Sequence, residues 1–179
     1  MQALDTPGPQ RGLVQIFTGN GKGKTTAALG IAMRAAGHGY KVFIIQFMKG
    51  LPQSGEVLIA DRIPNITVVQ VGRAHFVDLK KPSEPDRAAA RSGLDMAKSA
   101  MDEGYDVLIL DEILMACGPL IPLDEVLHLV KSKPFPLELI LTGRNAHPEL
   151  VAAADLVSEI REVKHPYRSG IPARKGIDY

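Results

Sequence analysis

The chain has 179 residues, of which 45% are hydrophobic and 23% charged, and its formal net charge is +1. These values fit one globular domain, and the near-zero charge means that any anion site must be local rather than a field of the whole protein. The single cysteine, Cys117, excludes an internal disulfide. No run approaches the ~20 apolar residues of a membrane span, and the first residues lack a secretory signal, so we expect a cytoplasmic protein.

The first eleven residues contain Pro7, Gly8 and Pro9 and little that could pack, so we predict a flexible arm over residues 1–11 and a single domain over residues 12–179. Short apolar runs then alternate with helix-like segments. In chain order we predict a strand at 13–18, a helix at 24–36, strands at 42–47 and 66–71, a helix at 84–102, a strand at 107–110, a helix at 123–131, a strand at 137–141, a helix at 149–154 and a strand at 156–160.

The predicted strands are near-continuous apolar runs, as is typical of strands that are covered on both faces. Alternation of strands with helices predicts a three-layer α/β fold with a mostly parallel central sheet of about six strands. In such sheets ligands bind beyond the carboxyl ends of the strands. The segments to consider first therefore begin at Thr18, Gln46, Gly72, Asp111 and Thr142.

A segment rich in glycine and lysine joins the first predicted strand to the first predicted helix. Residues 18–26 read TGNGKGKTT, and Gly23-Lys24-Thr25 fits the end of the phosphate-loop pattern G-x-x-x-x-G-K-[ST], although Thr18 stands at its opening glycine. We expect Lys24 to neutralise phosphate charge and the Thr25 hydroxyl to bind Mg²⁺. The segment predicts an ATP-binding fold of the P-loop NTPase (RecA-like) type; a plain glycine-rich turn is the alternative.

The predicted strand at 107–110 ends in two acids, Asp111 and Glu112. An apolar strand that ends in a carboxylate is the pattern that holds Mg²⁺ beside a phosphate loop, either directly or through water. Either carboxylate could contact the metal, and an exposed pair of acids at a strand end is the alternative.

Residues 19–26 (GNGKGKTT) resemble the phosphate loop of the P-loop type of ATP:corrinoid adenosyltransferases, a family of cobalamin biosynthesis. The resemblance continues, in order, at residues 34–39 (RAAGHG), 46–50 (QFMKG), 110–112 (LDE), 142–144 (TGR), 163–166 (VKHP) and 175–179 (KGIDY). It implies that cobalt(I) of a reduced corrinoid attacks C5′ of ATP and that triphosphate leaves. The protein must then orient C5′ against cobalt and stabilise the charge of the leaving group.

The resemblance also implies roles for individual residues. Lys24, Phe76 and Glu112 are the expected catalytic residues, and Thr25, Asp111 and Glu112 the expected ligands of Mg²⁺ or Mn²⁺. The residues expected to bind ATP are Gly19, Asn20, Gly21, Lys22, Gly23, Lys24, Thr25, Thr26, Arg34 and Arg144. For Arg144 a structural ion pair is the alternative to phosphate contact, and for Arg34 an ordinary position on a helix surface.

Family members place aromatic side chains under the corrin, where they exclude the lower axial ligand of cobalt and so favour its reduction. The corresponding residues here are 72–77 (GRAHFV), and the chain contains no tryptophan. We therefore predict that Phe76 faces the corrin and that His75, which could ligate cobalt, points away. An ordinary loop with one hydrophobic anchor is the alternative.

The expected partners are ATP, a corrinoid, a reduced flavoprotein as electron donor and a second copy of the chain in a homodimer, with no nucleic acid and no membrane. Three other interpretations remain. A P-loop kinase or ATP hydrolase would produce ADP. A RecA-like nucleic-acid module would need a basic stripe or a stacking platform, and only 5% of the residues are aromatic. A corrinoid carrier would bind ATP without consuming it.

Overall fold

The computed structural model describes residues 11–51 and 54–179. Within this part of the chain, six strands form one sheet in the order β3-β2-β4-β5-β1-β6, and all neighbouring strands are parallel. The strands are β1 (Val14–Thr18), β2 (Val42–Phe47), β3 (Ile66–Val71), β4 (Val107–Asp111), β5 (Glu138–Thr142) and β6 (Leu156–Glu159). The predicted sheet is thus confirmed.

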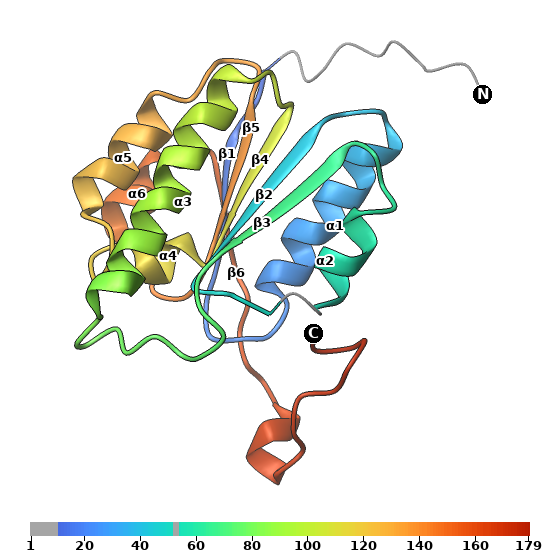
Figure 1. Cartoon of the computed structure of the whole chain (residues 1–179), viewed down its shortest axis with the longest axis vertical. Coiled ribbons are helices and arrows are strands. Elements are labelled where there is room, and N and C mark those ends of the chain that lie inside the picture. The colour runs from blue at the N-terminus through green and yellow to red at the C-terminus, as the bar shows by residue number, and fades with distance from the viewer. Residues whose placement is uncertain (1–10, 52–53) are drawn as a thin grey trace.

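Helices cover both faces of the sheet, which gives the predicted three layers (Figure 1). One face carries α1 (Lys24–Gly37) and α2 (Gly55–Ala60). The other carries α3 (Glu84–Asp102), α4 (Ile113–Ala116), α5 (Leu123–Lys131) and α6 (Pro148–Ala153). A short 3₁₀ helix, η1 (Pro166–Ser169), follows β6.

Every predicted strand and helix lies within one residue of an observed element at each end. The elements that the sequence did not predict are α2, α4 and η1, which have 6, 4 and 4 residues. Segments of this length complete fewer than two helical turns, so they cannot display a 3.6-residue hydrophobic period.

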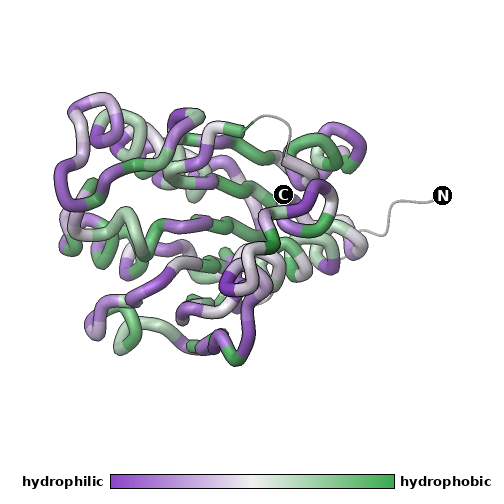
Figure 2. The backbone as a smooth tube through the Cα atoms, turned by 90° about the horizontal axis from the view of Figure 1, so that it is seen from below, coloured by the Kyte–Doolittle hydropathy of each residue, from purple (hydrophilic) through white to green (hydrophobic). Residues whose placement is uncertain are grey.

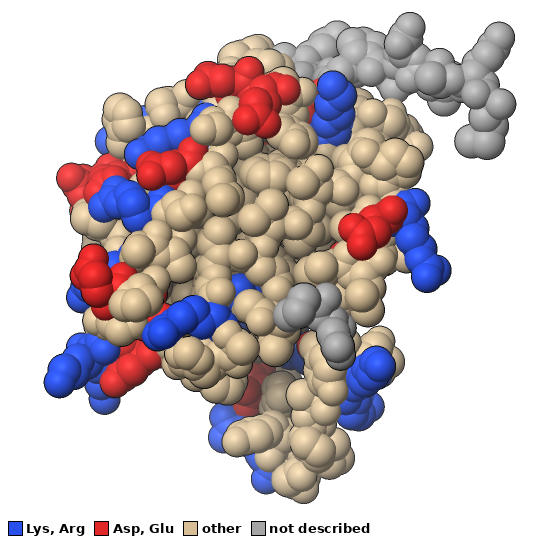
Figure 3. All heavy atoms as spheres, viewed as in Figure 1, with Lys and Arg blue, Asp and Glu red and all other residues tan. Residues whose placement is uncertain are grey.

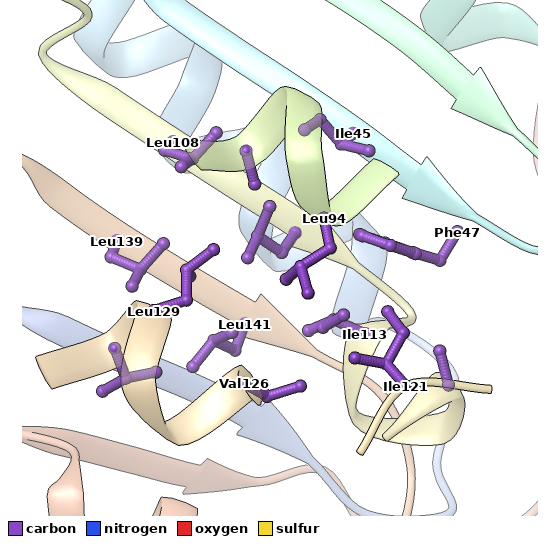
Figure 4. Packing of buried hydrophobic residues seen from close by; sticks show 14 of the residues in the cluster. Ile45, Phe47, Leu94, Leu108, Ile113, Ile121, Val126, Leu129, Leu139 and Leu141 are labelled. Atoms are coloured by element: carbon purple, nitrogen blue, oxygen red, sulfur yellow. The ribbon is translucent and has the colours of Figure 1, made fainter. Parts of the chain in front are cut away.

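The two faces of the sheet pack differently. On the α3 side, Leu94 of α3 and large aliphatic residues of α4 and α5 pack on large hydrophobic residues of the strands. Figure 4 shows Leu94, Ile113, Val126 and Leu129 against Ile45, Phe47, Leu108, Leu139 and Leu141. On the α1 side, buried Ala28, Ala32 and Ala35 face the sheet. Small side chains let a helix approach a sheet closely, which fixes the start of α1 against the strand ends. This buried packing explains why the strands are apolar along their whole length.

Hydrophobic stretches run through the interior of the molecule and hydrophilic ones through its outer loops (Figure 2), and acidic and basic side chains intermix on the face drawn in Figure 3. Among the described residues, no helix is both long enough and apolar enough to cross a membrane. The arm expected at residues 1–11 lies outside the described residues except for exposed Arg11, which is 3.9 Å from Asp155.

Candidate active site

The phosphate-loop segment and the two acids lie at the carboxyl-end edge of the sheet, which is the lower edge in Figure 1. The parallel pairing brings the ends of β1, β2, β4 and β5 to this one edge. Because β5 stands between β1 and β4, its last residue, Thr142, is placed between the phosphate loop and Asp111.

The loop between β1 and α1 is shaped by its glycines. Gly19 has a φ of +100°, and a Cβ there would lie 2.4 Å from the carbonyl oxygen of Ile160; a Cβ on Gly21 would lie 2.7 Å from the backbone of Arg161. The Gly21 amide donates a hydrogen bond to the Ile160 oxygen at 2.7 Å. These glycines are therefore required by close packing on the segment after β6, in addition to the predicted approach of an anion.

Lys24 is the first residue of α1 and is only 7% exposed. Its Nζ donates a hydrogen bond to the Gly21 carbonyl oxygen at 2.7 Å, within the loop itself. Burial lowers the pKa of Lys24 below its ordinary value, against the opposing effect of nearby Glu112. A bound polyanion would favour the charged form of this lysine. The ammonium group of Lys24 would therefore be stabilised when phosphate is present.

Asp111 is the centre of the polar network at the strand ends and is 1% exposed. Its Oδ1 accepts hydrogen bonds from the hydroxyls of Thr25 (2.8 Å) and Thr142 (2.6 Å). Its Oδ2 accepts from Gln46 Nε2 (3.2 Å) and Lys49 Nζ (2.7 Å). The network connects Thr25, at the start of α1, with residues near the ends of β2, β4 and β5. It also includes Lys49, which follows β2.

Sequence reasoning predicted Thr25 and Asp111 but assigned no role to Thr142, Gln46 or Lys49. Gln46 and Thr142 are fully buried although they are polar. Both stand at or next to the carboxyl end of an apolar strand, and Lys49 follows two residues after β2. The sequence did contain a signal for these residues, namely a polar residue at the end of an apolar strand. Such a residue is buried only where it has hydrogen-bond partners, so it indicates a polar network at that place.

Glu112 adopts the left-handed conformation, with φ 63°, and its amide donates to the Thr142 hydroxyl oxygen at 3.0 Å. It is half-buried, and burial, followed by the charge of Asp111, raises the pKa of its carboxyl above the usual range. A carboxylate held in this way favours a nearby cation, which would relieve both effects.

The substitution Glu112→Gln is expected to raise the free energy of unfolding of the ligand-free protein at pH 7 by about 1 kcal/mol, or roughly 2–4 °C in melting temperature. A raised pKa stabilises the folded state below the ordinary value of 4.5, and this contribution is lost as the pH rises through the higher folded value. The gain should therefore vanish below pH 4.5.

Urea unfolding of the parent and of Glu112→Gln, at pH 7 and below pH 4.5, measures this difference in the free energy of unfolding. The matched control is exposed Glu103→Gln, which we expect to change stability by less than about 0.5 kcal/mol at either pH. A Glu112→Gln protein that is less stable than the parent at pH 7 would contradict the argument.

Thr25, Asp111 and Glu112 offer one hydroxyl and two carboxylate groups at one place. Among the described residues no group of three or more His, Cys, Asp or Glu side chains forms a possible metal cage. A site of few oxygen ligands suits a hard cation such as Mg²⁺, which keeps waters and takes oxygens from substrate phosphates. The donor set thus fits the predicted metal.

A cavity of about 470 Å³ begins at the phosphate loop and continues between α1 and α2. Lys22, Lys24, Thr25, Thr26 and Glu112 line its polar end. Its other walls are mostly apolar and include Leu29, Ile59, Ile63 and Val68. Residues 176–179 line the same cavity. It can accept a ligand with a polyanionic part and an apolar part.

Two predicted arginines lie away from this cavity. Arg34 is exposed on the last turn of α1, roughly 15 Å along the helix from Lys24, and is not among the lining residues. Arg144 is exposed in the loop after β5 and lines a second, polar cavity together with Asn20, Arg161 and Arg168. Arg144 is close enough to lower the pKa of Lys24. The structure therefore brings Arg144, but not Arg34, near the phosphate loop.

The segment predicted to contact a corrin is the loop between β3 and α3. Arg73 anchors this loop to the first turn of α3, since its guanidinium donates to Asp86 Oδ1 and Ser83 Oγ, both at 3.0 Å. Beyond this anchor, His75 and Phe76 are exposed, and the Phe76 side chain is fully accessible to solvent. The orientation of Phe76 toward a corrin stays a prediction.

The family model for ATP:corrinoid adenosyltransferase BtuR/CobO/CobP matches residues 10–179. The chain belongs to this family. Corrinoid adenosyltransferases similar to it include those of Escherichia coli K12 (41% identical), Salmonella typhimurium LT2 (CobA, 40%) and Pseudomonas aeruginosa PAO1 (34%). Each alignment spans 172 residues and covers 95% of this chain and 85–87% of the relative. The match confirms the resemblance inferred from the phosphate loop and the motifs that follow it.

Proposed function

We propose that this family member transfers the 5′-deoxyadenosyl group of ATP to the cobalt of a reduced corrinoid and releases triphosphate. In this step cobalt(I) supplies both electrons of the new Co–C bond, and the bond between C5′ and the triphosphate oxygen breaks. One observation carries the proposal: in a chain of the corrinoid adenosyltransferase family, a single cavity joins a phosphate loop with a buried lysine to an apolar groove.

The polar end of the cavity suits the leaving group. Negative charge grows on the triphosphate as the C5′–O bond breaks, and donors that are already in position stabilise such charge most effectively. Lys24 is held at the start of α1 by its hydrogen bond to the Gly21 carbonyl oxygen, and the loop backbone is held against the segment after β6 by the hydrogen bond from the Gly21 amide to the Ile160 oxygen. Asp111, through its hydrogen bond from Thr25, fixes the hydroxyl at the start of α1.

We further propose that Thr25, Asp111 and Glu112 hold a Mg²⁺ or Mn²⁺ ion, which when bound would supply further positive charge beside the polyphosphate. Lys49 already neutralises one edge of Asp111, with Nζ 2.7 Å from Oδ2. Burial raises the pKa of Glu112, so a bound cation would stabilise the ionised form of Glu112 more than that of Asp111.

The apolar end of the cavity suits the nucleoside. Adenine and ribose would lie between α1 and α2, against Leu29, Ile59 and Ile63. C5′ connects the nucleoside to the polyphosphate, so we place it beside Lys49, which lines the same cavity. The corrin must then approach from the loops that follow β2 and β3, and the second of these carries Phe76.

The substitution Phe76→Ala is expected to lower the fraction of four-coordinate cobalt(II) corrinoid in the presence of ATP, because an aromatic side chain under the corrin excludes the lower axial ligand. ATP affinity should change less than about twofold, since Phe76 lies in a different loop from the phosphate loop. Electron paramagnetic resonance of the cobalt(II) complex measures the coordination state.

Phe135→Ala is a matched control, because Phe135 is also an exposed phenylalanine but precedes β5, at the opposite edge of the sheet. An unchanged four-coordinate fraction in Phe76→Ala would show that this residue does not contact the corrin. Neither substitution should lower stability by more than about 0.5 kcal/mol, since both side chains are exposed.

The reaction itself is tested by incubating the protein with ATP, Mg²⁺ and chemically reduced cobalamin. We expect a light-sensitive Co–C absorbance spectrum and one free triphosphate for each alkylated cobalt. ADP without alkylated cobalt would instead indicate a kinase or hydrolase, and binding of both ligands without consumption would indicate a carrier. A reduced flavoprotein donor and a homodimer remain predictions from the family resemblance.

A further inference from the structure

Lys22 of the phosphate loop is already paired with a carboxylate from the far end of the chain. Its Nζ forms an ion pair with Asp178 and donates a hydrogen bond to the Ile177 carbonyl oxygen at 3.2 Å. These two partners are 156 and 155 positions away from Lys22 in the sequence. Lys22 thus differs from Lys24, whose hydrogen bond stays inside the loop.

Asp178 belongs to a compact turn, residues 174–179, which we call the C-terminal turn. The Arg174 amide donates to Asp178 Oδ2 at 2.8 Å, the Asp178 amide donates to the Arg174 carbonyl at 2.8 Å, and the Gly176 amide donates to the Tyr179 carbonyl at 2.8 Å. The Asp178 side chain is 17% exposed, against 56% for Arg174. One carboxylate therefore both closes the turn and holds Lys22.

The C-terminal turn forms part of the wall of the cavity. Gly176, Ile177, Asp178 and Tyr179 line it together with the phosphate-loop residues. Figures 1 and 2 show the end of the chain returning below the sheet to the side that carries α1 and α2. A carboxylate in this position faces the space that the proposed function gives to a polyphosphate.

We propose that Asp178 is a positioning residue of the nucleotide site. It holds Lys22 at the cavity wall and releases it when a polyphosphate enters, so the C-terminal turn lowers the affinity for polyphosphate and speeds the release of triphosphate. The inference rests on the proposed function for the identity of this ligand. The physical basis is competition: an ammonium paired with a carboxylate must give up that pair before it can bind phosphate.

The substitution Asp178→Asn is expected to tighten binding of inorganic tripolyphosphate by about three- to tenfold. A partly exposed ion pair contributes a few-fold in equilibrium constant, and removal of a negative charge from the cavity wall adds to this. Isothermal titration calorimetry at low salt measures the affinity. If the substitution also loosens the C-terminal turn, Lys22 is released in the same way, so the expected direction is unchanged.

Asp95→Asn is the matched charge control, because Asp95 pairs with Lys98 on the exposed surface of α3, on the opposite face of the sheet. It should leave tripolyphosphate affinity within about twofold. Equal or weaker binding by Asp178→Asn than by the parent overturns the proposal, since competition between Asp178 and polyphosphate for Lys22 predicts tighter binding.

A second measurement follows the displacement of the turn directly. The chain contains no tryptophan, so Tyr179→Trp places a single indole fluorophore in the C-terminal turn. We expect its emission to change as tripolyphosphate is added, and the midpoint of this change to coincide with the midpoint of binding measured by calorimetry. The emission change should be lost in the double variant that also carries Lys22→Gln. Saturable binding of tripolyphosphate without an emission change excludes the release step.

Both measurements use tripolyphosphate without corrinoid, so they are separate from the test of the reaction. A protein that hydrolysed ATP to ADP could still show the release of Lys22, and the adenosyl transfer could proceed with Asp178 irrelevant to binding. The two hypotheses can therefore fail independently.

Discussion

Replacing Lys24 with methionine is expected to lower kcat/KM for ATP at least about 10²-fold while the protein remains folded. The buried ammonium is the cation that the phosphate loop holds in place, and the neutral methionine fills a similar volume. Stability should change little, because the lost hydrogen bond to Gly21 is offset by relief of the burial that lowers the Lys24 pKa. Formation of the Co–C bond and of triphosphate, followed over a range of ATP concentrations, measures the effect.

Lys22→Met removes the same charge from the same loop as Lys24→Met. Comparing the two variants therefore separates the effect of the buried position of Lys24 from the effect of losing a positive charge. The Lys22 side chain is 42% exposed and is paired with Asp178, so its loss should reduce kcat/KM by no more than about tenfold. Equal losses in the two variants would mean that the loop acts only as a diffuse patch of positive charge, and would contradict a specific role for the buried lysine.

Asp111→Asn is expected to lower the free energy of unfolding by about 3 kcal/mol and to reduce turnover by at least about 10³-fold. The amide of Asn can accept hydrogen bonds on one side only, so on the other side its NH₂ would face the donors of Lys49 and Gln46. At roughly 2–4 °C per kcal/mol for a domain of this size, the melting temperature should fall by about 6–12 °C.

Urea unfolding gives the stability change, and turnover is measured well below the melting temperature so that the two effects are separated. Asp95→Asn makes the same change of charge at an exposed site and should cost less than about 0.5 kcal/mol. A stable but inactive Asp111→Asn protein would assign Asp111 to catalysis alone and would refute its structural role at the strand ends.

The amino-acid sequence by itself determined the architecture of this protein. Its strands are buried on both faces and therefore read as continuous apolar runs, and its long helices have room to show a period and a start signal such as Pro85. The phosphate-loop segment and Asp111 were predicted as binding residues because phosphate and Mg²⁺ binding need particular residue types at fixed places beside a strand. The family followed from the same motifs, and the comparison with known corrinoid adenosyltransferases confirmed it.

Only the tertiary structure decided which polar residues meet. Thr142 reaches Asp111 because β5 lies between β1 and β4, and this strand order is set by long-range packing that no local pattern records. The pairing of Lys22 with Asp178 depends on the return of the chain after β6. Arg34 stays an untested prediction: the family resemblance implied a role near the nucleotide, and the length of α1 places this residue on the last turn of the helix, away from the phosphate loop. Local sequence specifies secondary structure and reactive groups, whereas distances between remote side chains arise only when the layers pack.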